Sequence, residues 1–93
     1  MVSNYQYPID TEWSTKEIVD VINFFACVEK AYECGVKQEE VMTKYSLFKK
    51  VVQSKMEEKK IGKSFEDTSG YSIYRVITSA KSMTSNKIVK IER

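Results

Sequence analysis

The side chains that could do catalytic chemistry in this chain are carboxylates and cysteines, because the sequence contains no histidine. The absence of imidazole excludes histidine-based metal sites and histidine-activated nucleophiles. Three carboxylate pairs consist of sequence neighbours, Glu39–Glu40, Glu57–Glu58 and Glu66–Asp67. Neighbouring residues on a helix point about 100° apart, so the members of each pair do not face each other as a general acid and its base would.

Glu29 and Glu33 are four residues apart, which places both carboxylates on one face of a helix. Di-iron bundles combine such carboxylates with a histidine three residues further on, and this chain has none. We therefore interpret the pair as part of a solvated helix face. The three glycines are isolated from one another, so the sequence contains no glycine-rich phosphate-binding loop. The sequence predicts no catalytic residue, no cofactor and no metal, and hence no enzyme.

The two cysteines predict free thiols. Cys27 and Cys34 are seven residues apart in one predicted helix, about 10.5 Å along its axis, whereas a disulfide needs Cα atoms within about 7 Å. The first residues lack the basic stretch and apolar run of a signal peptide. The longest uncharged apolar stretch, Val21 to Val28, is far shorter than the roughly 20 residues that span a bilayer. We expect a soluble, cytoplasmic protein.

The elements that must position these residues begin with a clearly marked helix. Ser14 at the N-cap and Glu17 three residues later have the spacing of a capping box, in which each side chain accepts a hydrogen bond from the other residue's backbone N–H. Apolar residues then recur at helical spacing from Ile18 to Tyr32. Gly35 suits the left-handed turn that ends a helix. The spacing predicts a central helix over residues 15–34.

Three further helices are predicted, over residues 38–52, 55–68 and 73–83. Residues 1–13 contain Pro8, which argues against a paired central strand, so we expect an extended N-terminal arm lying across the helices. Residues 84–93 are polar and basic, and we expect a flexible tail. A chain of 93 residues cannot fill two cores. The predicted fold is a single all-α domain, a compact irregular array of four to five helices.

The order of several short motifs resembles a family of small uncharacterised proteins from Bacillus-type bacteria, the YktA-like family. The first half carries the motifs Tyr7-Pro8-Ile9-Asp10, Glu12-Trp13-Ser14-Thr15 and Val28-Glu29-Lys30-Ala31-Tyr32-Glu33. The second half continues with Tyr45, Phe48-Lys49, Ser54-Lys55, Glu57-Glu58-Lys59, Phe65-Glu66, Ser69-Gly70-Tyr71-Ser72 and Tyr74-Arg75. The resemblance covers residues 5–80, with Gln53 standing where the family has a proline. It implies a helical array in a Gram-positive cytoplasm, and no activity.

Two surfaces are candidates for binding a partner, and the first is aromatic. It combines the arm with the start of the fourth helix and consists of Tyr5, Tyr7, Trp13, Tyr71, Tyr74 and Arg75. Tyrosine, tryptophan and arginine are the residue types that dominate interface hot spots. The alternative is that these aromatic side chains close a small core. The leading hypothesis is a small non-enzymatic module that binds another protein or a second copy of itself.

The second candidate surface is basic. Residues 1–40 hold three lysines and eight acidic residues, a net charge of −5, whereas residues 41–93 hold twelve basic and five acidic residues, a net charge of +7. This asymmetry is also compatible with complementary charges inside the fold or across a dimer. The basic half includes a candidate nucleic-acid surface on the third and fourth helices, followed by basic residues of the tail: Lys55, Lys59, Lys63 and Lys81, then Lys87, Lys90 and Arg93.

The third and fourth helices also flank Gly70 in the manner of a helix-turn-helix motif. Nucleic-acid binding is therefore the alternative function. Glu66 argues against this motif, because it stands four residues before Gly70, where close packing usually requires a small side chain. The sequence pI of about 8.5 is also below the value typical of such domains.

Overall fold

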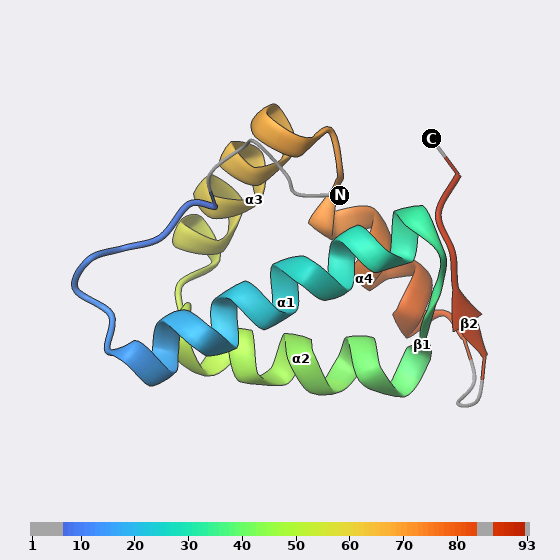
Figure 1. The fold of residues 1–93 in the computed structure, drawn as a ribbon, viewed down its shortest axis with the longest axis horizontal. Helices are drawn as coiled ribbons and strands as arrows, with labels where there is room; N and C mark the ends of the chain where they lie inside the picture. Colours follow the sequence, from blue (N-terminus) through green and yellow to red (C-terminus); the bar gives the residue numbers. More distant parts are fainter. Residues whose placement is uncertain (1–6, 84–86, 93) are drawn as a thin grey trace.

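Helices dominate the computed structural model, which describes residues 7–83 and 87–92 and confirms the predicted all-α class. The elements in chain order are α1 (Thr15–Glu33), β1 (Val36–Lys37), α2 (Gln38–Val51), α3 (Lys55–Ser69), α4 (Ile73–Lys81) and β2 (Ile88–Val89). Helices α1 and α2 lie side by side along the long axis of the molecule, and the two short strands close one end (Figure 1). The helix bounds differ from the predicted ones by two residues at most.

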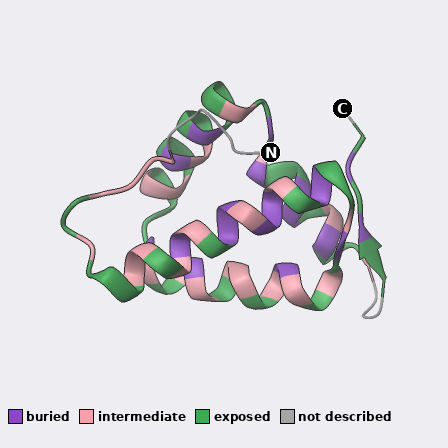
Figure 2. Ribbon diagram, in the orientation of Figure 1, coloured by how far each residue is buried: buried purple, intermediate pink, exposed green. Residues whose placement is uncertain are grey.

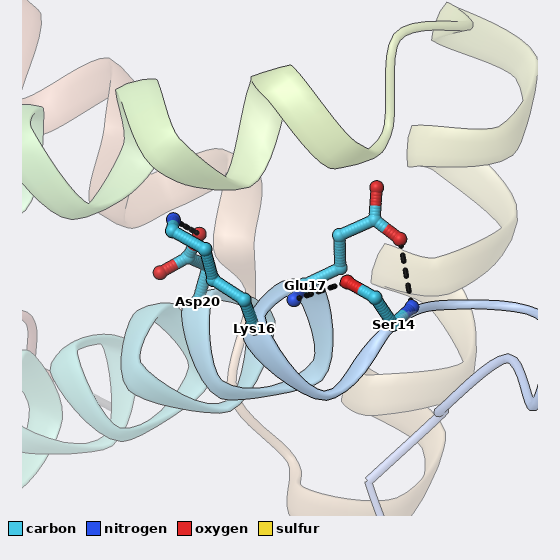
Figure 3. A network of polar contacts seen from close by, with 4 residues as sticks. All are labelled: Ser14, Lys16, Glu17 and Asp20. Carbon is cyan, nitrogen blue, oxygen red and sulfur yellow. Dashed lines mark hydrogen bonds and ion pairs between the residues drawn. The ribbon is translucent and has the colours of Figure 1, made fainter.

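Local sequence signals fix the ends of α1. The Ser14 hydroxyl accepts a hydrogen bond from the Glu17 backbone N–H at 3.2 Å, and the Glu17 carboxylate accepts one from the Ser14 N–H at 2.8 Å (Figure 3). One turn further, Lys16 and Asp20 form an exposed ion pair at 3.0 Å. At the other end Gly35 has φ +91°, the left-handed conformation that its position predicted. The predicted capping box is confirmed.

The core is built on aromatic rings around α1, whose inner face is buried from Val21 to Tyr32 (Figure 2). Phe24 packs on Phe48 of α2 with ring centroids 4.6 Å apart, and Phe25 stacks on Phe65 of α3 at 4.8 Å. Tyr7 completes this cluster, with its ring 5.3 Å from that of Phe25 and 6.2 Å from that of Phe65. The described part of the arm therefore crosses α1 and α3, as expected.

Serine caps also begin the two later helices. The Ser54 hydroxyl accepts from the Glu57 N–H at the start of α3, and the Ser72 hydroxyl accepts from the Arg75 N–H at the start of α4. Between them Gly70 has φ +82° and its N–H donates to the Glu66 carbonyl at 2.8 Å, which turns the chain sharply from α3 into α4.

The C-terminal segment differs from the sequence prediction. Strand β2 pairs antiparallel with β1, with Val36 opposite Val89. Val89 is fully buried and Ile91 nearly so, and the Ile91 N–H donates to the Ala31 carbonyl of α1 at 2.9 Å. The prediction of a flexible tail over residues 84–93 is therefore wrong for residues 87–92, because alternate apolar side chains of this segment pack into the core. Residues 84–86 and 93 lie outside the described residues.

Candidate binding groove

A groove of about 880 Å³ is lined by side chains of α2, α3 and α4. Helix α3 contributes Lys55, Lys59 and Lys63, which recur every four residues and therefore project from one side of that helix. Lys81 of α4 and Lys49 of α2 also line the groove. All four lysines of the predicted basic surface thus lie in one concave site, which the sequence pattern alone did not indicate.

The inner lining of the groove is apolar and comes from α4. Ile73 and Ile77 are each only 6% exposed, so they form its floor. Tyr74 also lines the groove but is 77% exposed, which is unusual for a large aromatic side chain. The site therefore combines an apolar floor, an exposed tyrosine and a lysine-rich rim.

A polar cluster compensates one of the acidic side chains in the groove. Lys49 lies 2.6 Å from one carboxylate oxygen of Glu58, and the Tyr45 hydroxyl donates to the other at 2.9 Å. Burial, reinforced by the neighbouring Glu58 carboxylate, raises the pKa of Tyr45 to about 12, so its phenol stays a hydrogen-bond donor at neutral pH. Lys49 is paired in this way and Lys63 pairs with Asp67 at 3.6 Å, which leaves Lys55, Lys59 and Lys81 of the groove beside the one remaining lining carboxylate, Glu66.

The predicted aromatic surface is divided among several places. Tyr7 is packed in the core cluster, and Tyr71 is 9% exposed and stacks on Tyr32 with ring centroids 4.6 Å apart. Trp13 is half-buried and lines a separate cleft of about 280 Å³ together with Ile61. Among the described members of the set, Tyr74 is the aromatic residue in the groove.

The two remaining members of the set lie elsewhere. Arg75 projects toward the C-terminal segment, where its guanidinium donates to the Glu92 carbonyl at 3.3 Å. Tyr5 lies outside the described residues.

Glu29 and Glu33 have a structural role that their spacing did not reveal. The Tyr7 hydroxyl lies 3.1 Å from both carboxylate oxygens of Glu29, and the Tyr71 hydroxyl donates to Glu33 at 2.7 Å. Burial, together with the nearby Glu33 charge, raises the pKa of the Glu29 carboxyl. The interpretation of this pair as a merely solvated face is corrected, because both carboxylates hold tyrosines from distant parts of the chain.

Several residues that line the groove belong to neither predicted surface, among them Tyr45, Gly62, Ile73 and Ile77. None of these four residues was assigned a binding role from the sequence. One available signal was Gly62, a glycine in the middle of an otherwise strongly helical segment. Across residues 7–83 and 87–92, no group of three potential ligands is placed to hold a metal ion, and no helix is long and apolar enough to cross a membrane.

Comparison with known proteins identifies the family. A family model described as an uncharacterised protein family, UPF0223, matches residues 4–89. A UPF0223 protein of Bacillus mycoides is 52% identical over 87 residues, which cover 94% of this chain and 98% of the relative. A relative from Streptococcus gordonii is 48% identical over 88 residues, covering 95% and 96% of the two chains. The predicted resemblance to an uncharacterised family of Gram-positive bacteria is confirmed: the chain belongs to the UPF0223 family.

Proposed function

We propose that the protein is a non-enzymatic binding module that recognises another protein through the groove between α2, α3 and α4. The observation that carries the proposal is the placement of an exposed tyrosine, Tyr74, beside the apolar floor of Ile73 and Ile77 and inside a rim of lysines. An apolar centre with an aromatic anchor and a charged rim is the usual composition of a protein interface. This proposal keeps the predicted class of function and moves the interface from the arm to the groove.

The charge of the rim indicates the chemistry of the partner. Lys63 is paired with Asp67, so Lys55, Lys59 and Lys81 are the rim lysines left beside the one lining carboxylate outside an ion pair, that of Glu66. Lysine ammonium groups around a low-dielectric floor attract acidic side chains and speed their encounter. The partner surface should therefore be acidic at its edge and apolar at its centre.

Nucleic-acid binding is the second candidate, because the same four lysines that were predicted to contact phosphates line this groove. Two features favour protein over nucleic acid. The floor is apolar, and Glu58 and Glu66 would stand close to a phosphate backbone. Binding dominated by phosphate contacts would also weaken steeply with salt, whereas binding anchored on Tyr74 would respond much less.

A matched pair of charge reversals tests the proposal. Lys59 lines the groove, whereas its sequence neighbour Lys60 points about 100° away around α3 and lines the small cleft near Trp13. Both lysines are exposed, so Lys59→Glu and Lys60→Glu make the same charge change on the same helix. Tagged forms of both variants and of the parent are used to recover partners from the lysate of the native cell, with and without nuclease and at two salt concentrations.

The expected result is a protein partner that survives nuclease and salt, is retained by Lys60→Glu and is lost with Lys59→Glu. Equal retention by both variants would show that the groove is not the interface. Loss of all recovered material on nuclease treatment would overturn protein binding in favour of nucleic acid.

A further inference from the structure

We infer that the occupant of the groove is an acidic amphipathic helix of the partner protein, seated against the backbone of α3 at Gly62; this inference rests on the proposed protein-binding function. Gly62 lies in the interior of α3 and lines the groove. Glycine in a helix interior is destabilising relative to alanine. The presence of glycine at this position therefore calls for a physical reason.

Nothing in the described part of the chain supplies that reason. A Cβ atom added at Gly62 would meet no atom within 4 Å, and unlike Gly35 and Gly70 this glycine does not have positive φ. Alanine would therefore fit both the space and the backbone conformation. The missing side chain instead leaves the α3 backbone open toward the groove, the arrangement that permits close approach of another backbone.

The flanking lysines define what approaches. Lys59 precedes and Lys63 follows Gly62 along α3, all three line the groove, and Lys81 lines it from α4. An occupant that lies against Gly62 passes between these ammonium groups. Acidic side chains along both edges of the occupant would meet them, while apolar side chains on its inner face would cover Ile73 and Ile77.

A helix fits this site better than an extended peptide. An extended peptide gains affinity by pairing its backbone with an exposed strand edge, whereas the walls of this groove are helices and offer no strand edge. A helix satisfies its own backbone hydrogen bonds and needs only side-chain complementarity. The first and last of the three lysines of α3 are eight residues apart, about 12 Å along the helix axis, which is the length of about two helical turns.

A designed peptide tests the inference directly. The probe is a synthetic helical peptide with leucines at i, i+3, i+4 and i+7 and glutamates flanking this stripe. Its controls are a peptide of the same composition in scrambled order, and the same peptide with a central proline. A fluorescently labelled single-stranded oligonucleotide serves as the polyanion control. Binding is measured by fluorescence anisotropy on the full chain, and the contact is located by NMR shifts of the Gly62 and Tyr74 amides.

The decisive variant is Gly62→Ala, with Ser64→Ala as its control. Ser64 is exposed on α3 outside the groove, and alanine is the better helix former at both positions. Both variants should keep or raise Tm, by about 4 °C for Gly62→Ala. Gly62→Ala should nevertheless weaken peptide binding by about tenfold, because a methyl group enters a close contact. Ser64→Ala should leave it unchanged.

Equal binding of the helical, scrambled and proline-containing peptides would overturn the inference that the occupant is a helix. Preferential binding of the oligonucleotide would overturn it as well. If Gly62→Ala bound the helical peptide with unchanged affinity, the close contact of the occupant with the α3 backbone at Gly62 would be overturned. If no peptide binds while the cellular partner still depends on Lys59, the helix inference fails and the protein-binding groove stands. If neither binds, both fail. Concentration-dependent self-association lost with Lys59→Glu would instead identify a second copy of this chain as the occupant.

Discussion

Replacing Val89 by alanine tests whether the C-terminal segment is a packed part of the core. Val89 is fully buried and lies opposite Val36 in the strand pair. The substitution removes two methyl groups, each worth about 0.8 kcal/mol of transfer free energy. The cavity left behind adds about 1 kcal/mol, because surrounding atoms relax only in part. We expect the free energy of unfolding to fall by about 2.5 kcal/mol.

In a domain of this size, 1 kcal/mol corresponds to about 4–8 °C in Tm, so Val89→Ala should lower Tm by about 10–20 °C. Urea denaturation followed by circular dichroism gives the free energy, with Lys90→Ala as the matched control. Lys90 is exposed beside Val89, so its substitution should change stability by less than about 0.5 kcal/mol. Hydrogen exchange supplies a second measurement, since the Ile91 N–H is bonded to the Ala31 carbonyl of α1.

Docking of the C-terminal segment on the core would be refuted if Val89→Ala were as stable as Lys90→Ala and the Ile91 amide exchanged as fast as an unstructured one. Two other outcomes would distinguish strand pairing from core packing. One is an equal loss of stability in both variants, and the other is protection of the Ile91 amide with no effect of Val89→Ala on stability. The magnitude thus distinguishes a docked segment from one that only touches the surface.

Three further predictions concern α1 and its neighbours. Ser14→Ala should cost about 1 kcal/mol, because the Glu17 N–H loses its acceptor, and urea denaturation against Thr11→Ala measures it; no loss would mean that water replaces the cap. The raised pKa of Glu29 means that its contribution to stability is present below the unfolded value of 4.5 and is lost as pH rises through the folded pKa. Glu29→Gln should flatten that part of the pH–stability curve, and an unchanged curve would contradict the assignment. Burial raises the pKa of Cys27 to about 11, so only the exposed Cys34 should react rapidly with a disulfide reagent, and Cys34→Ser should abolish the fast phase.

The helices were predictable because their signals are local. Ser14 and Glu17 are three residues apart, and Gly35 and Gly70 each permit a left-handed turn without reference to the rest of the chain. Such signals depend on backbone geometry that the neighbouring residues determine alone. Helix bounds within two residues of the observed ones follow from this locality.

The strand pair was not predictable, because it joins segments 53 residues apart in the register of Val36 and Val89. Each strand has only two residues, and the lysines among Ile88, Val89 and Ile91 make the segment look like a solvated terminus. Nothing local distinguishes an alternating segment that docks from one that frays. Whether this segment docks depends on the apolar surface that α1 and α2 leave uncovered at the end of the molecule where the strands pair.

Residue type likewise could not decide which aromatic side chains are core and which are exposed. Tyr7, Tyr71 and Tyr74 have the same chemistry, yet only Tyr74 is largely exposed among them. The difference comes from acceptors elsewhere in the chain, since Glu29 and Glu33 receive the hydroxyls of Tyr7 and Tyr71. A buried tyrosine needs such a partner, and sequence spacing does not reveal it across 22 or 38 residues.

The groove exists because α3 has only a small apolar face to pack against the rest of the molecule. Its apolar stripe is thin: Ile61 and Phe65 are buried, but Met56 is 73% exposed. Tyr7 supplies part of the missing apolar surface by packing against both Phe25 and Phe65. This anchors one side of α3 to α1, so that its lysine-bearing side is left to face α4 across open space. The arm was expected to bind a partner directly. Its role is instead structural, because it holds in place the helix that forms a wall of the binding groove.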